Sequence, residues 1–181
     1  MDHDKLVASL KKASPELLNE IKLEAEARLD AQLSTAIASD QRAMTFLGFL
    51  LTLVAFLIGA SLAAITAATP SPTIANIAAA GAIGLGLSGV LAYLASRPID
   101  FRFVGNDPES WTGDIDNNIS LHDALAEQTA YYDKMLKANR RAMKIGAELL
   151  RWASIVAGVT VLVCGVLSGW FVIWAPVANP T

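Results

Sequence analysis

The chain has 181 residues, of which 54% are hydrophobic and 17% are charged, and its formal net charge is −3 at pH 7. Soluble domains carry about 25% charged residues, so this composition argues against an ordinary soluble domain. The mildly acidic balance argues against a general nucleic-acid binder. A single cysteine and two histidines exclude a disulfide framework and argue against a metal site.

Two long stretches of the sequence contain neither a charged residue nor a histidine. They cover residues 43–96 and 152–181, which are 54 and 30 residues long. The hydrocarbon core of a bilayer is about 30 Å thick, and a helix needs about 20 apolar residues to cross it. The first stretch is long enough for two crossings and the second for one. We therefore expect an all-α membrane protein with three transmembrane helices, at residues 43–68, 74–96 and 152–174.

The charged residues indicate the orientation of these spans. All 14 Lys and Arg and all 17 Asp and Glu lie outside the apolar stretches, and the linker 69–73 and the tail 175–181 carry no charge. Because basic segments stay on the cytoplasmic side of a membrane, we expect a multi-pass membrane protein with its N-terminus inside and its C-terminal tail outside. The cytoplasmic parts are then an N-terminal arm, a loop and an amphipathic helix (residues 1–42, 97–119 and 120–151).

Both cytoplasmic helices have a recognisable start and an apolar stripe. Ser14 before Pro15 is typical of a helix N-cap and first position, and Ser120 with Asp123 indicates the second start. The first stripe is Leu18, Ile21, Ala25, Leu29, Leu33 and Ile37. The second alternates spacings of four and three, as in a coiled coil: Leu121, Leu125, Gln128, Tyr132, Met135, Asn139, Ala142, Gly146 and Leu149. Because no helix breaker precedes either span, we expect a parallel helical stalk that continues into the membrane.

Small residues recur at every fourth position of the second span, at Ala80, Gly84 and Ser88. The first span has a shorter series that begins at Gly59. Such a strip lets another helix approach closely. The neighbouring helix belongs either to the same chain or to a second copy, so the strip predicts packing within the chain or a homo-oligomer.

The loop after the second span is the first candidate for a ligand site. Its residues Arg97, Phe101, Arg102 and Trp111 combine guanidinium groups with aromatic faces. Guanidinium groups bind phosphate and aromatic faces stack on bases, so this composition suits a nucleotide. The alternative is a loop that packs against the cytoplasmic helices and binds no ligand.

A basic cluster on the second cytoplasmic helix is another candidate for phosphate or anionic lipid. Its members are Lys134, Lys137, Arg140, Arg141 and Lys144. Of these, Arg140 and Arg141 are the expected ligand contacts. The alternative is ion pairing with acidic residues at similar heights on the first arm, namely Glu24, Glu26 and Asp30.

Three polar residues are candidates for a switch or a structural pairing: Asp40, Arg42 and Asn139. Asp40 continues the apolar stripe of the first arm at the membrane edge, where an ionisable group is costly unless it is paired or functional. Its candidate partners are Arg42, Lys144 and Arg151. Asn139 interrupts the stripe of the second helix, as does Gln128.

The layout resembles the transmembrane effectors of Pycsar anti-phage defence (the PycTM family), which have two spans, a cytoplasmic insertion, a long amphipathic helix and a further span. The segment Ser39-Asp40-Gln41-Arg42-Ala43 is similar to an acidic-x-basic-small motif at the first span of that family. Asn139-Arg140-Arg141 is similar to the polar helix before its last span. The resemblance implies a partner pyrimidine cyclase that makes cUMP or cCMP upon infection. The effector binds this messenger and impairs the inner membrane, which causes abortive infection.

Two other functions compete with a nucleotide-activated effector. A holin-like pore-forming toxin damages membranes without a ligand, and a scaffold subunit does not damage them at all. The sequence shows no nucleophile–base pair, no metal cluster and no phosphate-binding loop. We therefore expect no enzymatic activity, no metal and no cofactor apart from the signalling nucleotide.

Overall fold

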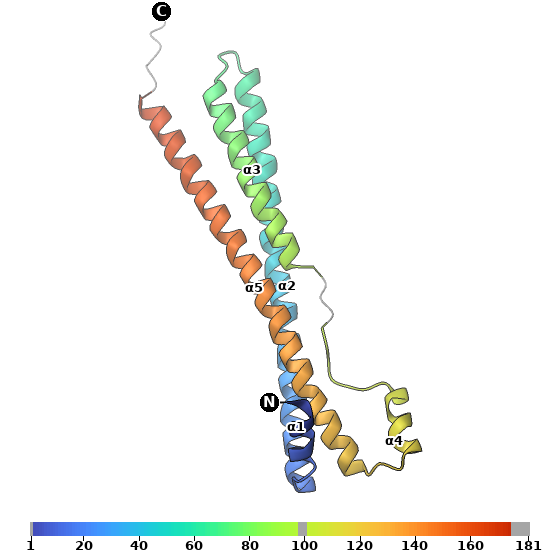
Figure 1. Cartoon of the computed structure of the whole chain (residues 1–181). Coiled ribbons are helices and arrows are strands. Elements are labelled where there is room, and N and C mark those ends of the chain that lie inside the picture. The colour runs from blue at the N-terminus through green and yellow to red at the C-terminus, as the bar shows by residue number, and fades with distance from the viewer. Residues whose placement is uncertain (1, 98–100, 175–181) are drawn as a thin grey trace, which may run out of the picture. The chain divides into compact units, whose positions relative to one another are not determined.

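The computed structural model describes residues 2–97 and 101–174, and these residues are mostly helical (Figure 1). In chain order the helices are α1 (His3–Leu10), α2 (Pro15–Thr66), α3 (Pro72–Ala95), η1 (Pro108–Trp111), α4 (Thr112–Asp116) and α5 (Leu121–Trp174). The described residues contain no β-strand. Helices α2, α3 and α5 are each long and apolar enough to cross a membrane. The prediction of an all-α chain with three such helices is therefore confirmed. The predicted tail, residues 175–181, lies outside the described residues.

Helices α2 and α5 begin where the sequence predicts. Ser14 Oγ accepts a hydrogen bond from the backbone N–H of Leu17 at 3.2 Å, and Ser120 Oγ accepts one from the N–H of Asp123 at 3.1 Å. Such N-cap bonds satisfy N–H groups that have no partner inside the helix. Helix α2 then continues for 52 residues and α5 for 54. Each amphipathic segment and the apolar segment after it form a single helix, as predicted.

The connection between α3 and α5 contains two short helices, η1 and α4, that differ from the irregular loop predicted there. Pro108 begins η1, where its missing N–H costs no hydrogen bond. Helix α4 ends in a Schellman motif, in which the N–H groups of Asn118 and Ile119 donate to the carbonyls of Ile115 and Asp114. Asn118 adopts a positive φ of 51°, a conformation that asparagine tolerates better than most residues. Helix α1 was likewise not predicted.

The chain divides into two compact units. We call residues 1–38 together with 98–144 the polar unit, and residues 39–97 together with 145–181 the apolar unit. Helices α2 and α5 each contribute their N-terminal part to the polar unit and their C-terminal part to the apolar unit. The apolar unit extends a few residues beyond the predicted spans at 39–42, 97 and 145–151, so it includes a few charged residues.

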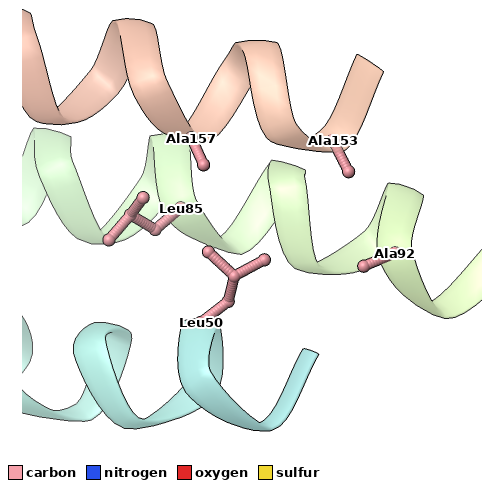
Figure 2. Packing of buried hydrophobic residues seen from close by; sticks show 5 residues of the cluster. All are labelled: Leu50, Leu85, Ala92, Ala153 and Ala157. Carbon is pink, nitrogen blue, oxygen red and sulfur yellow. The ribbon is translucent and has the colours of Figure 1, made fainter. Parts of the chain in front are cut away.

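In the apolar unit, α3 packs against both α2 and α5. The core contains Leu50 of α2, Leu85 and Ala92 of α3, and Ala153 and Ala157 of α5. In Figure 2, Leu50 points from α2 toward α3, and the two alanines of α5 lie on the side that faces α3. Alanine at such positions lets helices approach closely and pack backbone against backbone.

Large apolar side chains cover the outside of the apolar unit. Phe56, Leu162, Val166 and Ile173 are each at least 69% exposed. A soluble protein rarely leaves a contiguous apolar surface of this kind open to water. A surface of this kind suits contact with lipid.

The small-residue strip of α3 packs within the chain at two of its predicted positions. A Cβ atom added to Gly84 would lie 2.5 Å from Thr160 Oγ1 of α5. Ser88 is fully buried, and its hydroxyl donates to the carbonyl of Ala153 at 2.7 Å. Because the α5 partner number falls as the α3 number rises, the two helices are antiparallel.

The other two predicted packing residues have a different environment. Ala80 and Gly59 are exposed, and a Cβ atom added to Gly59 would meet nothing within 4 Å. Among the described residues, packing within the chain therefore has no support at Gly59, and Ala80 is not part of the buried core. Contact with a second copy stays a prediction.

In the polar unit, α1 and α2 pack against the N-terminal part of α5. Leu10 and Leu18 contact Ala126 and Ala130 in one cluster, and Leu29 contacts Tyr132 and Met135 in the next. The residue numbers of the contacting side chains increase together along α2 and α5, so these two helices run parallel in this unit. The predicted stripes are wrong at Ile37 and Leu121, which are 52% and 68% exposed.

Candidate functional site

The side-chain amide of Asn139 on α5 binds the backbone of Arg102 in the segment that precedes η1. Asn139 is only 2% exposed. Its Oδ1 accepts from the backbone N–H of Arg102 at 3.0 Å, and its Nδ2 donates to the carbonyl of Arg102 at 2.7 Å. Both backbone groups of Arg102 are satisfied in this way. This pairing explains a polar residue within an apolar stripe, since a buried amide needs hydrogen-bond partners.

Arg102 is thereby placed beside an aromatic residue of α5. Its Nη1 donates to the hydroxyl of Tyr131 at 2.9 Å. Two residues further on, Val104 packs against the cluster of Leu29, Tyr132 and Met135. The described residues of this segment therefore pack against the helices, as one of the two interpretations expected. Arg102 in addition makes a specific hydrogen bond to Tyr131.

Tyr131 also lines a cavity of about 430 Å³, a volume within the range of small-molecule sites. Trp111 of η1 provides a second aromatic side chain, and Ala124 an apolar one. The remaining lining residues are polar: His3, Asn106, Ser110, Asp114, Glu127 and Gln128. We call this cavity the Trp111 pocket. It brings together residues of α1, η1, α4, α5 and the segment before η1, which are far apart in the sequence.

The Trp111 pocket contains polar atoms that lack a partner. His3 Nδ1 and Gln128 Oε1 are buried and form no hydrogen bond among the described residues. An orphaned buried polar atom is rare in proteins and costs about 1–3 kcal/mol. A ligand with polar groups can supply the missing partners.

Charge in and beside the pocket is partly neutralised by α1 and its turn. Lys11 Nζ lies 2.7 Å from Glu127 Oε1, and this hydrogen bond raises the pKa of Lys11. The carbonyl of Lys11 lies 3.2 Å from His122 Nε2. These contacts attach the end of α1 to α5 beside the pocket.

A second cavity of about 600 Å³ lies among α1, α2 and α5. Its lining is mostly aliphatic and contains no aromatic residue. The Trp111 pocket is the better candidate site, because it combines aromatic faces with primary amides and adjoins Arg102.

Two of the predicted ligand residues, Trp111 and Arg102, lie near each other in the structure. Trp111 lines the pocket, and Arg102 donates a hydrogen bond to Tyr131, which also lines it. Phe101 is partly exposed and does not line the pocket, and Arg97 is an exposed residue of the apolar unit. Arg140 and Arg141 are exposed and do not line it either.

The predicted ion pairs between the basic cluster and the first arm are wrong. Among the described residues, Lys137 pairs with Asp133 of its own helix at 2.6 Å, and Glu26 pairs with Lys22 at 3.2 Å. Neighbours one turn away on a helix are always within reach, whereas a pair between helices needs matching side-chain directions. Arg140 and Arg141 form no ion pair within the described part of the chain.

Asp40 is partly exposed and forms no ion pair with Arg42 or Arg151 in the described structure. Arg151 instead has Glu148 of its own helix as its nearest acidic partner, at 3.8 Å. The role of Asp40 in a structural pairing or as a switch stays a prediction. No three His, Cys, Asp or Glu side chains of the described residues come together as metal ligands.

Sequence reasoning missed the pocket residues His3, Asn106, Gln128 and Tyr131. Gln128 carried a signal, because it interrupts an apolar stripe. Comparison with family models, curated proteins and solved structures gave no match. Fold and site together describe an all-α protein with three helices long enough to cross a membrane and a polar cavity in its charged part.

Proposed function

We propose that the chain is a membrane effector of a bacterial anti-phage defence system, similar to the Pycsar transmembrane effectors. A partner pyrimidine cyclase makes cUMP or cCMP upon infection, the polar unit binds this nucleotide, and the apolar unit then impairs the inner membrane. The three long apolar helices support the membrane location. The Trp111 pocket is the observation that carries the ligand part of the proposal.

The lining of the pocket suits the parts of a cyclic nucleotide. Trp111 and Tyr131 offer aromatic faces on which a base stacks. Asn106 and Gln128 offer amides for the polar edge of the base. Arg102, bonded to the Tyr131 hydroxyl, is the proposed contact of the cyclic phosphate, because guanidinium groups bind phosphate oxygens strongly.

The orientation that we propose has the polar unit in the cytoplasm and the C-terminus outside. The distribution of basic residues supports it, since none lies in the linker between the first two spans or after residue 151. The messenger and the pocket then share one compartment.

Helices α2 and α5 are the proposed route from ligand to membrane, because both run from the polar unit into the apolar unit without interruption. A ligand changes such an equilibrium only through different affinities for two states. A shift from 1:99 to 99:1 requires an affinity ratio of about 10⁴. In a homo-oligomer with several nucleotide sites, the affinity ratios of the sites multiply, so each site needs only a smaller difference in affinity between the two states.

The proposal predicts that cUMP or cCMP raises the melting temperature of the full-length protein in detergent. Arg102→Ala is expected to abolish this rise while the protein still folds, because the substituted side chain is exposed. Arg151→Ala, which replaces an exposed arginine that does not line the pocket, serves as the matched control. A wild-type protein that responds to neither nucleotide contradicts the proposal.

The holin-like alternative gives a different result in cells. Expression of the chain alone, without a cyclase, is then lethal, whereas the proposed effector requires the cyclase. Growth curves with an inducible cyclase and with an inactive cyclase separate the two functions. Lethality that is equal in both strains contradicts nucleotide activation.

A further inference from the structure

Gln128 of α5 is held in one orientation by two neighbours. Its Nε2 donates to the hydroxyl oxygen of Tyr132 at 2.9 Å. The hydroxyl of Tyr132 in turn donates to Glu26 Oε1 of α2 at 3.1 Å. The three side chains form a short hydrogen-bonded chain from α2 to the wall of the Trp111 pocket.

The direction of this chain follows from the chemistry of its end. A carboxylate only accepts hydrogen bonds, so the phenolic hydrogen of Tyr132 points to Glu26. The phenolic oxygen can then only accept, and the amide of Gln128 must present its NH₂ group to it. Burial and the charge of Glu26 raise the pKa of Tyr132 to about 12, so the phenol keeps its hydrogen at physiological pH.

With the NH₂ group turned to Tyr132, Gln128 Oε1 is left as a fixed acceptor. This atom is buried and has no partner among the described residues. The lining also has two carboxylates, but Glu127 is paired with Lys11. Asp114 is partly exposed, and its carboxylate is not among the buried atoms without a partner. Gln128 Oε1 gains most from a ligand donor, because water does not reach it.

We propose that Gln128 Oε1 reads the base of the bound nucleotide by accepting a hydrogen bond from an N–H group on the edge of a pyrimidine. This assignment rests on the proposed function. Uracil offers its N3–H and cytosine its 4-amino group, so the shared chemistry is an N–H donor.

Because Gln128 Oε1 is buried in the free protein, the proposal requires part of the pocket lining to move, and we propose that α1 is this part. His3 is the residue that α1 contributes to the pocket. The first turn of α1 is held weakly, since Asp2 makes no side-chain capping bond there. A base that displaces His3 reaches the acceptor and relieves its missing hydrogen bond.

The test measures the affinity of full-length protein in lipid nanodiscs by calorimetry with four nucleotides: cUMP, N3-methyl-cUMP, cCMP and N4,N4-dimethyl-cCMP. Methylation removes the N–H donor and leaves the phosphate unchanged. Wild-type protein is expected to bind the methylated partner of its preferred nucleotide about tenfold or more weakly, because an unpaired buried acceptor remains. This comparison uses wild-type protein only, so it does not depend on how a substitution affects folding.

Gln128→Met is expected to bind the preferred nucleotide about tenfold more weakly and to lose the discrimination against methylation. Gln32→Met is the matched control. Gln32 also has a buried unpartnered Oε1, and its Nε2 donates to the carbonyl of Leu136 at 3.3 Å, but it does not line the pocket.

The results separate the assignment of Gln128 from the proposed function. Equal affinity for methylated and unmethylated nucleotides overturns the assignment of Gln128 and leaves the proposed function standing. Unchanged affinity and discrimination in Gln128→Met have the same meaning. Wild-type protein that binds none of the four nucleotides overturns both the assignment and the proposed function.

Discussion

Replacement of Gly84 by alanine is expected to destabilise the apolar unit by about 1–3 kcal/mol. The new Cβ atom would lie 2.5 Å from Thr160 Oγ1 and 2.7 Å from its Cγ2, which is closer than atoms approach without movement. Thr160 has little freedom to yield, because its side chain is branched at Cβ and its hydroxyl donates to the carbonyl of Val156 at 2.8 Å. The helices must therefore separate, and overpacking of this kind costs about 1–3 kcal/mol.

Thermal unfolding in a mild detergent measures this effect. Gly86→Ala is the matched control on α3, because a Cβ atom added there meets nothing within 4 Å. The double variant Gly84→Ala with Thr160→Ala is expected to recover part of the lost stability, since it removes the two closest atoms. Equal stability of Gly84→Ala and Gly86→Ala would contradict the antiparallel packing of α3 on α5.

Replacement of Asn139 by leucine is expected to release the segment around Arg102 and to abolish the nucleotide response. The substitution removes both hydrogen bonds to the Arg102 backbone and places an apolar group against an N–H and a carbonyl. Each buried polar group left without a partner costs about 1–3 kcal/mol. Once released, Arg102 is no longer positioned beside Tyr131 and the Trp111 pocket.

Hydrogen exchange read by mass spectrometry follows the release directly. Peptides that contain Arg102 and Val104 are expected to exchange much faster in Asn139→Leu, while peptides from the apolar core around Leu50 keep their protection. Asn19→Leu, an exposed asparagine of α2, controls for the substitution itself. Unchanged exchange at Arg102 would show that Asn139 does not hold this segment.

The features that depend on local chemistry could be predicted from the sequence. Ser14 and Ser120 start their helices because a hydroxyl caps the first turn wherever the chain allows it. The absence of a breaker makes α2 and α5 continuous. The apolar stretches predicted three helices of membrane length, since length and hydropathy need no knowledge of neighbouring segments.

The features that depend on segments far apart in the sequence were missed or predicted wrongly. Ile37 and Leu121 follow the helical spacing but are exposed, because periodicity does not show where a facing element ends. Lys137 pairs within its own helix, and the pattern of charges along two arms does not show side-chain directions. The Trp111 pocket is built from five segments, and their meeting is encoded in packing that no short motif reports.

Asn139 and Gln128 are the instructive intermediate case. Both interrupt the apolar stripe of α5 in the sequence, and both have specific hydrogen-bond partners in the structure. A polar residue in a buried stripe must be satisfied, so the sequence predicts that a partner exists. It does not predict which partner, because Arg102 and Tyr132 are chosen by the fold.

Nucleotide activation of membrane damage is tested most directly by the permeability of proteoliposomes that contain the full-length protein and an entrapped fluorescent dye. We expect the vesicles to retain the dye until cUMP or cCMP reaches the polar unit and to release it from then on. Linear 5′-UMP and 5′-CMP should leave the vesicles intact. Vesicles that retain their dye with both cyclic nucleotides, or that leak equally without them, would contradict a nucleotide-activated membrane effector.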